Sequence, residues 1–260
     1  MKTISRTIFS VIFILTAFWA SAQEYQRTPR KYDFELSDVA KSIIPVLSFN
    51  KNMHPNGWLW KEGRSSALVE KGKPADFYEI NKIDDINMDI GEDDTGTAWV
   101  EGVKGDGIGE WVIIPVKFDD DDFESRFVNG KTDGKLKIDL WICNGFQQNL
   151  DLYYKNNRVK DARISVYAAA YSAGQDDAFL LWNPDCIYDK TITVTDELAD
   201  RNPICLNWHS ENFSVTLPEK YRGEHCELYL KLEIRSVYKG TKYSDTCISH
   251  MRAVAREVKD

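Results

Sequence analysis

Five glycines fall within sixteen residues between positions 96 and 111, GTAWVEGVKGDGIGEW, as they do in some phosphate-binding loops. A Walker loop beginning at Gly102 would need a lysine at position 108, which is Ile108. A dinucleotide fingerprint needs G-x-G-x-x-G before a helix, whereas this run reads G-x-G-x-G and leads into the strand-like EWVIIPVKF. The glycines therefore predict a turn that enters a β-strand, with Trp99 and Trp111 packed beside it, and no phosphate site.

Side chains that catalyse hydrolysis or bind metals show no recognisable spacing. The four histidines never form H-E-x-x-H, no G-x-S-x-G is present, and the five cysteines form no C-x-x-C or Cys/His zinc pattern. The 41 acidic residues leave open a carboxylate pair of the glycosidase kind, because such a pair forms in space and not in sequence. A glycan-acting hydrolase is therefore an alternative hypothesis, although no catalytic residue is predicted.

The acidic run FDDDDFE, residues 118–124, lies between two strand-like segments and is most simply a solvated loop. Carboxylate oxygens suit calcium, but the run lacks the spaced ligands and turn glycine of an EF-hand. We predict no cofactor, leave structural calcium open, and assign no metal ligand.

Aromatic rings in turn-rich segments are the more informative binding candidates, because flat rings stack on the apolar faces of sugars. Trp58 and Trp60 lie in HPNGWLWKEG, and the Asn-rich turn DLYYKNNRVKDARI (151–164) places two tyrosines beside amide and guanidinium donors. In a binding role the donors contact sugar hydroxyls while a ring stacks. The alternative is an ordinary turn, with buried rings and Arg158 paired to an acid.

The beginning of the chain reads as a secretory signal peptide. Lys2 and Arg6 precede an apolar run from Ile8 to Ala20, and the small-x-small pattern Ala20-Ser21-Ala22 suits cleavage. The run is about 13 residues, short of the roughly 20 that span a bilayer. We expect a signal peptide over 1–22, a linker over 23–37, no membrane span after cleavage, and a secreted, periplasmic or cell-envelope location.

Charge and length restrict the remaining possibilities. Removal of Lys2 and Arg6 takes the formal net charge from -8 to -10, and a body that acidic repels nucleic-acid phosphates. Nucleic acid is therefore not an expected partner. Residues 38–260 have a length that suits one large β-domain.

The elements that must position these side chains are short strands. Runs such as WVIIPVKF, LKIDLWI and ELYLKLEIRSVY are rich in β-branched and aromatic residues and are separated by turn signals. Their apolar residues alternate, which places Lys137, Asp139, Lys231 and Glu233 on the solvent side. Short helices are expected only near 38–44 and 249–258. The pattern predicts an all-β, antiparallel β-sandwich with little helix.

The cysteines allow one or two disulfides in an exported protein, with at least one thiol left over. Cys143 lies in LKIDLWICNGF, where it is expected to face the core. A Cys186–Cys205 bond is one possible pairing, because spacing alone does not fix connectivity.

Three segments together resemble a known family: TAWVEGVKGDGIGEWV (97–112), LWICNGFQQNLDLYYKNNRVKDARI (140–164) and LEIRSVYKGTKYSDTCISHM (232–251). They are similar to the discoidin-like β-sandwich, a jelly roll, that forms the glycan-binding, translocation-promoting domain of streptococcal NAD-glycohydrolase toxins. The resemblance covers residues 90–252. It implies a secreted, non-catalytic binding protein that recognises a carbohydrate or cell-surface ligand through loops at one end of the sandwich. NAD cleavage is not expected, because the chain ends at Asp260 soon after the last motif.

With this resemblance, the acids of the glycine-rich turn, Glu101, Asp106 and Glu110, are expected to cluster with Arg158 or Lys242. A structural or adhesive envelope protein that binds another protein is a third hypothesis, and the oligomeric state stays open. The residues predicted to contact a ligand are Trp58, Trp60, Glu101, Asp106, Tyr153, Tyr154, Asn157, Arg158, Lys242, Tyr243 and Asp245.

Overall fold

The computed structural model describes residues 34–43, 63–75, 77–79, 97–118, 133–173, 178–198 and 205–258. All of them belong to one compact unit, Phe34–Asp260. The predicted signal peptide, the acidic run beyond Phe118, and Trp58 and Trp60 lie outside the described residues.

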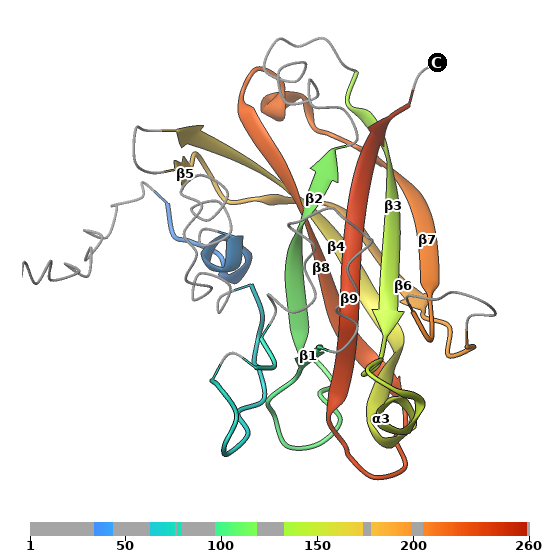
Figure 1. Ribbon diagram of the computed structural model, residues 1–260. Coiled ribbons are helices and arrows are strands. Elements are labelled where there is room, and N and C mark those ends of the chain that lie inside the picture. Colours follow the sequence, from blue (N-terminus) through green and yellow to red (C-terminus); the bar gives the residue numbers. More distant parts are fainter. Residues whose placement is uncertain are drawn as a thin grey trace, which may run out of the picture. The chain divides into compact units, whose positions relative to one another are not determined.

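Within the described residues, nine strands make up the sheet (Figure 1). They are β1 (Trp99–Val100), β2 (Trp111–Phe118), β3 (Lys135–Asn144), β4 (Asn157–Ala173), β5 (Ala178–Leu180), β6 (Asp185–Thr193), β7 (His209–Thr216), β8 (His225–Tyr238) and β9 (Thr246–Glu257).

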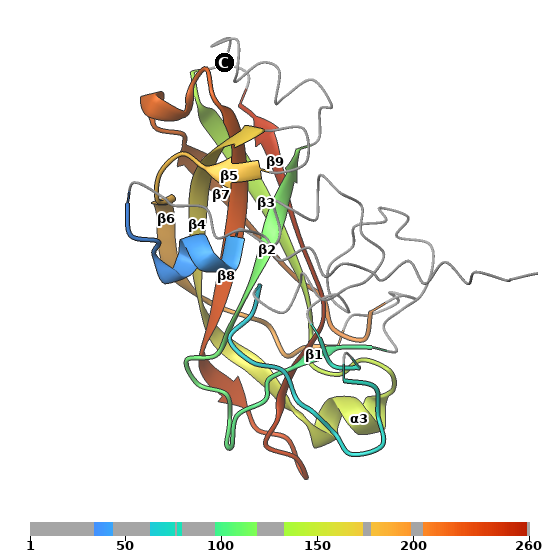
Figure 2. The ribbon, with the colours of Figure 1, turned by 90° about the vertical axis from the view of Figure 1, so that its left-hand side faces the viewer.

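The strands form two layers that are joined at both ends. One layer runs from β5 and β6 through β4 and β8 to β2, and the other contains β1, β9, β3 and β7 (Figures 1 and 2). Most pairs are antiparallel. At one end β2 leaves β8 and pairs in parallel with β9 over Lys117 and Phe118. At the other end the first residues of β4, Asn157 and Arg158, pair in parallel with the start of β9.

The core lies between the layers and is built by alternation. Leu228, Leu230 and Leu232 of β8 are at most 1% exposed, and Leu136 and Ile138 of β3 are fully buried in the same cluster. Burial of each such side chain stabilises the fold by about 1.5 to 3 kcal/mol. The predicted all-β sandwich with little helix is confirmed.

The outer face of β8 is more covered than its alternation suggests. The side chains of Lys231 and Glu233 are 19% and 17% exposed, and the ring of Tyr229 is fully buried. The Lys231 ammonium lies 4.9 Å from the centroid of the Trp111 ring. Solvent therefore reaches only part of this face, whereas Lys137 of β3 is exposed as predicted.

Helix is short within the described residues, and only part of it was predicted. The predicted helix near 38–44 is present over 38–43, but residues 249–257 belong to β9 and the predicted helix there is wrong. Because β9 is paired with β3 along most of its length and buried on both faces, apolar residues occupy successive positions and obscure the period of two. A helix that was not predicted, α3, spans Leu150–Lys155 and is capped by the Asn149 side chain.

The disulfide joins Cys143 to Cys205, with Cα atoms 6.2 Å apart. Cys143 is buried, as expected, but the suggested pairing of Cys186 with Cys205 is wrong, because Cys186 is an exposed free thiol on β6. Cys143 lies near the end of β3 and Cys205 comes shortly before β7, which pairs with β3. Strand pairing therefore brings the two sulfur atoms together.

The end of the predicted linker contacts the sandwich. Asn183 Oδ1 accepts a hydrogen bond from the Ser37 amide at 2.9 Å, and its Nδ2 donates to the Glu35 carbonyl at 2.7 Å. Residues 35–37 therefore have a fixed place against the segment that follows β5.

Candidate binding surface at the loop end

Three segments meet where β4 begins and β8 ends: the glycine loop (101–110), α3, and the 239–245 loop. Figure 1 shows all three at the same end of the strands. The Thr241 amide donates to the Tyr154 carbonyl at 2.9 Å, and the Thr246 hydroxyl donates to the Asp106 carbonyl at 2.7 Å. We call these three segments the loop end.

The glycine loop is a turn into β2, as predicted. Trp99 is fully buried and its Nε1 donates to the Ser66 carbonyl at 2.9 Å, whereas Trp111 is half-buried. The loop turns through glycines with φ angles of 117°, 66° and 91° at positions 105, 107 and 109. Side chains other than glycine are disfavoured at such angles. These glycines therefore set the backbone path of the turn, and the stretch is not a phosphate-binding loop of the Walker type.

Glu101 is a buried carboxylate that braces this loop. Its Oε2 accepts from the Val103 amide at 2.8 Å, and its Oε1 accepts from the Thr246 amide at 3.3 Å. Desolvation raises the pKa of Glu101 to about 7 against these two hydrogen bonds, with Asp245 and Glu110 adding to the rise. The side chain thus joins the glycine loop to the start of β9 and is not exposed to a ligand.

Asp106 and Asn157 connect the glycine loop to the 239–245 loop at the start of β4. Asn157 Nδ2 donates to Asp106 Oδ1 at 3.1 Å and to the Ser244 carbonyl at 2.6 Å, while its Oδ1 accepts from the Gly240 amide at 2.8 Å. Lys239 forms an ion pair with Asp106 and lowers the pKa of that carboxyl. Asn157 is 1% exposed, so its amide holds loops together.

The prediction that the loop acids cluster with Arg158 or Lys242 is therefore wrong, because these acids bind other residues. Asp106 pairs with Asn157 and Lys239, and Glu110 accepts hydrogen bonds from the hydroxyls of Ser65 and Ser66. The sequence did not place Ser65 and Ser66 near the glycine loop, because they are 45 and 44 positions from Glu110.

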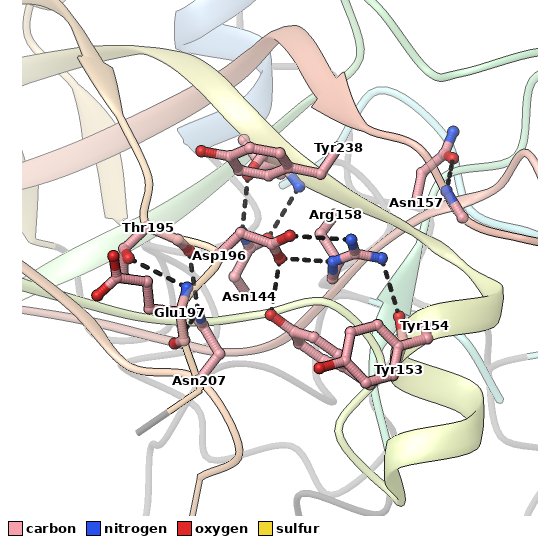
Figure 3. Close-up of polar contacts among 12 residues, drawn as sticks. Asn144, Tyr153, Tyr154, Asn157, Arg158, Thr195, Asp196, Glu197, Asn207 and Tyr238 are labelled. Carbon is pink, nitrogen blue, oxygen red and sulfur yellow. Dashed lines mark hydrogen bonds and ion pairs between the residues drawn. The ribbon is translucent and has the colours of Figure 1, made fainter. Parts of the chain in front are cut away.

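Arg158 is held by Asp196 instead. Its Nε and Nη2 donate to the two carboxylate oxygens at 2.6 and 3.0 Å, and its Nη1 donates to the carbonyls of Tyr153 and Asn156 at 3.2 and 3.0 Å (Figure 3). The residue is only 5% exposed. Such a bidentate pair combines charge with fixed geometry.

Tyr153 completes this buried group. Its ring is fully buried, and its hydroxyl donates to Asp196 Oδ1 at 2.8 Å. The Arg158 guanidinium carbon lies 4.9 Å from the ring centroid. Sequence reasoning missed Asp196, because it is 38 positions from Arg158 and no motif distinguishes it from other acids of the same insert.

Tyr154 and Tyr243 are the predicted ligand residues that reach solvent as large rings. They are 44% and 38% exposed, and the Lys242 ammonium lies 4.8 Å from the centroid of the Tyr243 ring. The Lys155 carbonyl accepts from the amides of both Lys242 and Tyr243. Backbone hydrogen bonds therefore fix the 239–245 loop against α3 and keep the two tyrosines on neighbouring segments.

Further exposed apolar side chains lie on the same segments. Val103 and Ile108 of the glycine loop are 40% and 54% exposed, and Leu150 of α3 is 48% exposed. Exposed apolar side chains that gather at one end of a fold are typical of an interaction site.

Asp245, another of the predicted ligand residues, is partly buried, and desolvation raises its pKa.

Within the described residues, no group of three or more His, Cys, Asp or Glu side chains is arranged to hold a metal ion. None of the helices in those ranges is both long and apolar enough to cross a membrane.

Residues 59–253 match the family model of the NAD glycohydrolase translocation F5/8 type C domain. The chain belongs to this family. The match contains the whole loop end, and the discoidin-like sandwich agrees with it. No curated protein and no solved structure matches the chain. The family model describes the translocation domain of NAD glycohydrolase and not its catalytic domain.

Proposed function

We propose that this translocation-type domain is an exported, non-catalytic binding protein that recognises a carbohydrate or cell-surface ligand through the loop end. The observation that carries the proposal is the pair of exposed tyrosines, Tyr154 and Tyr243, on segments joined by backbone hydrogen bonds. Its family is that of a translocation domain, a role in which contact with a cell surface is useful.

The two rings suit a sugar because they are exposed and yet supported. Tyr154 contacts the buried Tyr153 ring edge to face, with centroids 5.2 Å apart. Tyr243 is attached to the Lys155 carbonyl through its amide at 2.8 Å. A segment whose backbone is already fixed loses less conformational freedom when a ligand binds to it. The hydroxyls also offer hydrogen bonds at the edge of each ring.

Lys242 adds a charged donor beside the Tyr243 ring. Lys242 is exposed, and its interaction with Tyr243 raises its pKa. A protonated amine next to a stacking ring favours a glycan that carries hydroxyl or carboxylate groups. The surface therefore provides both stacking and charge-assisted hydrogen bonding.

The other predicted ligand residues fall into three groups in this proposal. Glu101, Asp106, Tyr153, Asn157 and Arg158 brace the loops that present the tyrosines. Asp245 is partly buried at the end of the 239–245 loop, and Trp58 and Trp60 remain predicted contacts outside the described residues.

The test is binding of the purified protein to a glycan array and to cultured animal cells. Tyr154→Ala and Tyr243→Ala are each expected to weaken binding about tenfold, which corresponds to about 1.4 kcal/mol. Val258→Ala shortens a similarly exposed apolar side chain just after β9, outside the loop end, and serves as the control. Unchanged binding in both tyrosine variants would overturn the assignment.

The exposed aliphatic residues Val103, Ile108 and Leu150 favour a second candidate, a protein-binding adhesin that uses the same surface. Enzymatic removal of glycans from the cultured cells separates the two. Binding that is lost with the glycans supports the first proposal, and binding that persists and is sensitive to Ile108→Ser supports the second.

A further inference from the structure

Asp196 binds residues that support the loop end, but it lies in a segment that is not part of the loop end. It lies in the 194–198 segment after β6 and receives hydrogen bonds from Arg158 and Tyr153. Neither the family match nor the motifs single it out. The following inference rests on the proposed function of the loop end.

The 194–198 segment is held on both sides of Asp196. Asn207 Nδ2 donates to the carbonyl of Thr195 at 3.0 Å and to that of Glu197 at 2.8 Å. The Thr195 amide donates to His209 Nδ1 at 3.3 Å. Asn207 is fully buried, so the backbone on either side of Asp196 is fixed by a side chain protected from water.

Residues 205–207 are in turn attached to β3 and the residues that follow it. The disulfide ties Cys205 to Cys143, and Gln147 provides a second tether. Gln147 Oε1 accepts from the Leu206 amide at 2.8 Å, and its Nε2 donates to the Asn207 carbonyl at 2.8 Å. Asp196 is therefore anchored through residues 205–207 to the opposite layer.

From Asp196 the connection continues to the exposed tyrosines in two steps. Arg158 contacts the carboxylate on one side and the carbonyls of Tyr153 and Asn156 on the other. These residues fix the C-terminal turn of α3, where the Lys155 carbonyl holds the amides of Lys242 and Tyr243. Figure 3 shows the Asp196 carboxylate beside Arg158, with the rings of Tyr153 and Tyr154 next to each other on α3.

We propose that Asp196 is a positioning residue of the binding surface. It touches no ligand, but its carboxylate fixes Arg158 and Tyr153, and through them the relative placement of Tyr154 and Tyr243. Loss of the carboxylate leaves a buried guanidinium without its charge partner, which destabilises the contacts that Arg158 makes with α3.

The chain contains a matched control for this ion pair. Arg163 of β4 pairs with Asp189 of β6, just as Arg158 of β4 pairs with Asp196 after β6. The Arg163 pair is exposed, with side chains 42% and 37% accessible, and lies within the sheet. Asp196→Asn and Asp189→Asn therefore make the same chemical change at a buried and at an exposed pair.

The test is amide hydrogen exchange of the purified protein without any ligand. Asp196→Asn is expected to speed exchange at least tenfold in 150–156 and 239–246, with a smaller change in the strands of the core. Asp189→Asn is expected to leave both regions unchanged. Equal exchange in Asp196→Asn and the unaltered protein at the loop end would overturn the proposal.

A global loss of stability must be separated from the local effect. Val215→Ala shortens a core side chain of β7 and is expected to lower overall stability while leaving the loop end relatively protected. If it accelerates exchange in 239–246 as much as Asp196→Asn does, the role is merely structural and the proposal is wrong. Tyr153→Phe removes only the hydroxyl donor to Asp196 and is expected to give a weaker change of the same kind in α3, even if Asp196→Asn does not fold.

A panel of cell-surface N-glycans distinguishes this inference from the proposed function. If the unaltered protein binds the panel, Asp196→Asn is expected to bind at least tenfold more weakly at a temperature where it is fully folded. If the unaltered protein binds neither the glycan panel nor cultured cells, the proposed function fails, whereas the exchange result still decides whether Asp196 positions the loop end.

Discussion

Gly107 lies directly against the side chain of Glu101. A Cβ atom built on this glycine would be 2.5 Å from Glu101 Cγ and 2.8 Å from Cδ. The glycine loop therefore needs a residue without a side chain at this position, both for its φ angle of 66° and for space.

Gly107→Ala is expected to destabilise the protein by about 2 to 3 kcal/mol, because the new methyl group displaces the buried carboxylate. Gly109→Ala is the comparison, since its φ of 91° is also unfavourable but its Cβ would meet no atom within 4 Å. It should cost about 1 kcal/mol. Urea unfolding measures both, and equal losses would show that backbone strain alone decides.

Glu101 predicts a pH dependence of stability. The pKa of Glu101 is about 7 in the folded protein against an ordinary value of 4.5, so between these pH values the folded protein keeps a proton that the unfolded chain has released. Its contribution to stability is therefore greatest below pH 4.5 and is lost as pH rises through about 7. The size is on the order of 3 kcal/mol.

Glu101→Gln is the variant that checks this dependence, because glutamine resembles the neutral acid. Thermal unfolding from pH 5 to pH 8 should show a smaller decline in the variant than in the unaltered protein. Glu219→Gln changes an exposed acid of the 3-10 helix (Glu219–Tyr221) and should retain the full decline. An identical pH profile in Glu101→Gln would contradict the assignment.

The two arginines of β4 should differ in their effect on stability. Arg158→Ala leaves Asp196 and Tyr153 without their cation, and we expect a loss of about 3 kcal/mol. Arg163→Ala breaks an exposed pair and should cost less than about 1 kcal/mol. Denaturation midpoints with unchanged m values give the comparison. A similar loss in both would mean that burial of Arg158 has little energetic consequence.

The disulfide should make a large contribution to stability, because it joins residues 62 positions apart. The chain-entropy model gives about 4 kcal/mol for a loop of that length. The double variant Cys143→Ala with Cys205→Ala should unfold at a correspondingly lower urea concentration. Cys186→Ser, which alters an exposed free thiol, should have almost no effect.

Thiol counting provides a separate check of the cysteine assignment. Five cysteines less the two of the disulfide leave three thiols, of which Cys226 and Cys247 are buried and Cys186 is exposed. A thiol reagent should therefore label one site in the native protein and three after denaturation. Desolvation raises the pKa of Cys186, so the native reaction should accelerate toward alkaline pH. Five labelled sites without a reductant would contradict the disulfide.

Local sequence patterns predicted the elements that local physics controls. The alternation in β8 and β3 indicated strands because side chains along a strand point to opposite faces whatever their partners are. The glycines at 105, 107 and 109 indicated a turn because they tolerate backbone angles that other residues resist. The three family-like segments placed both exposed tyrosines among the candidate ligand residues.

Features that depend on strand pairing were predicted poorly. Burial on both faces of β9 removed its alternation, so residues 249–257 resembled a helix, and α3 was too short to show a helical period. The pairing of Cys143 with Cys205 follows from the place of β7 beside β3.

The sequence by itself therefore determined the strands, the sandwich class and the glycine turn, because each follows from the preferences of neighbouring residues. The tertiary structure alone decided which candidates are buried braces and which are exposed. The residue types of Arg158 and Tyr153 do not distinguish them from residues of the surface. Both are buried and bind Asp196, which is 38 positions from Arg158 in the sequence. Contacts between distant segments cost chain entropy that only the complete fold offsets, so no local pattern encodes them.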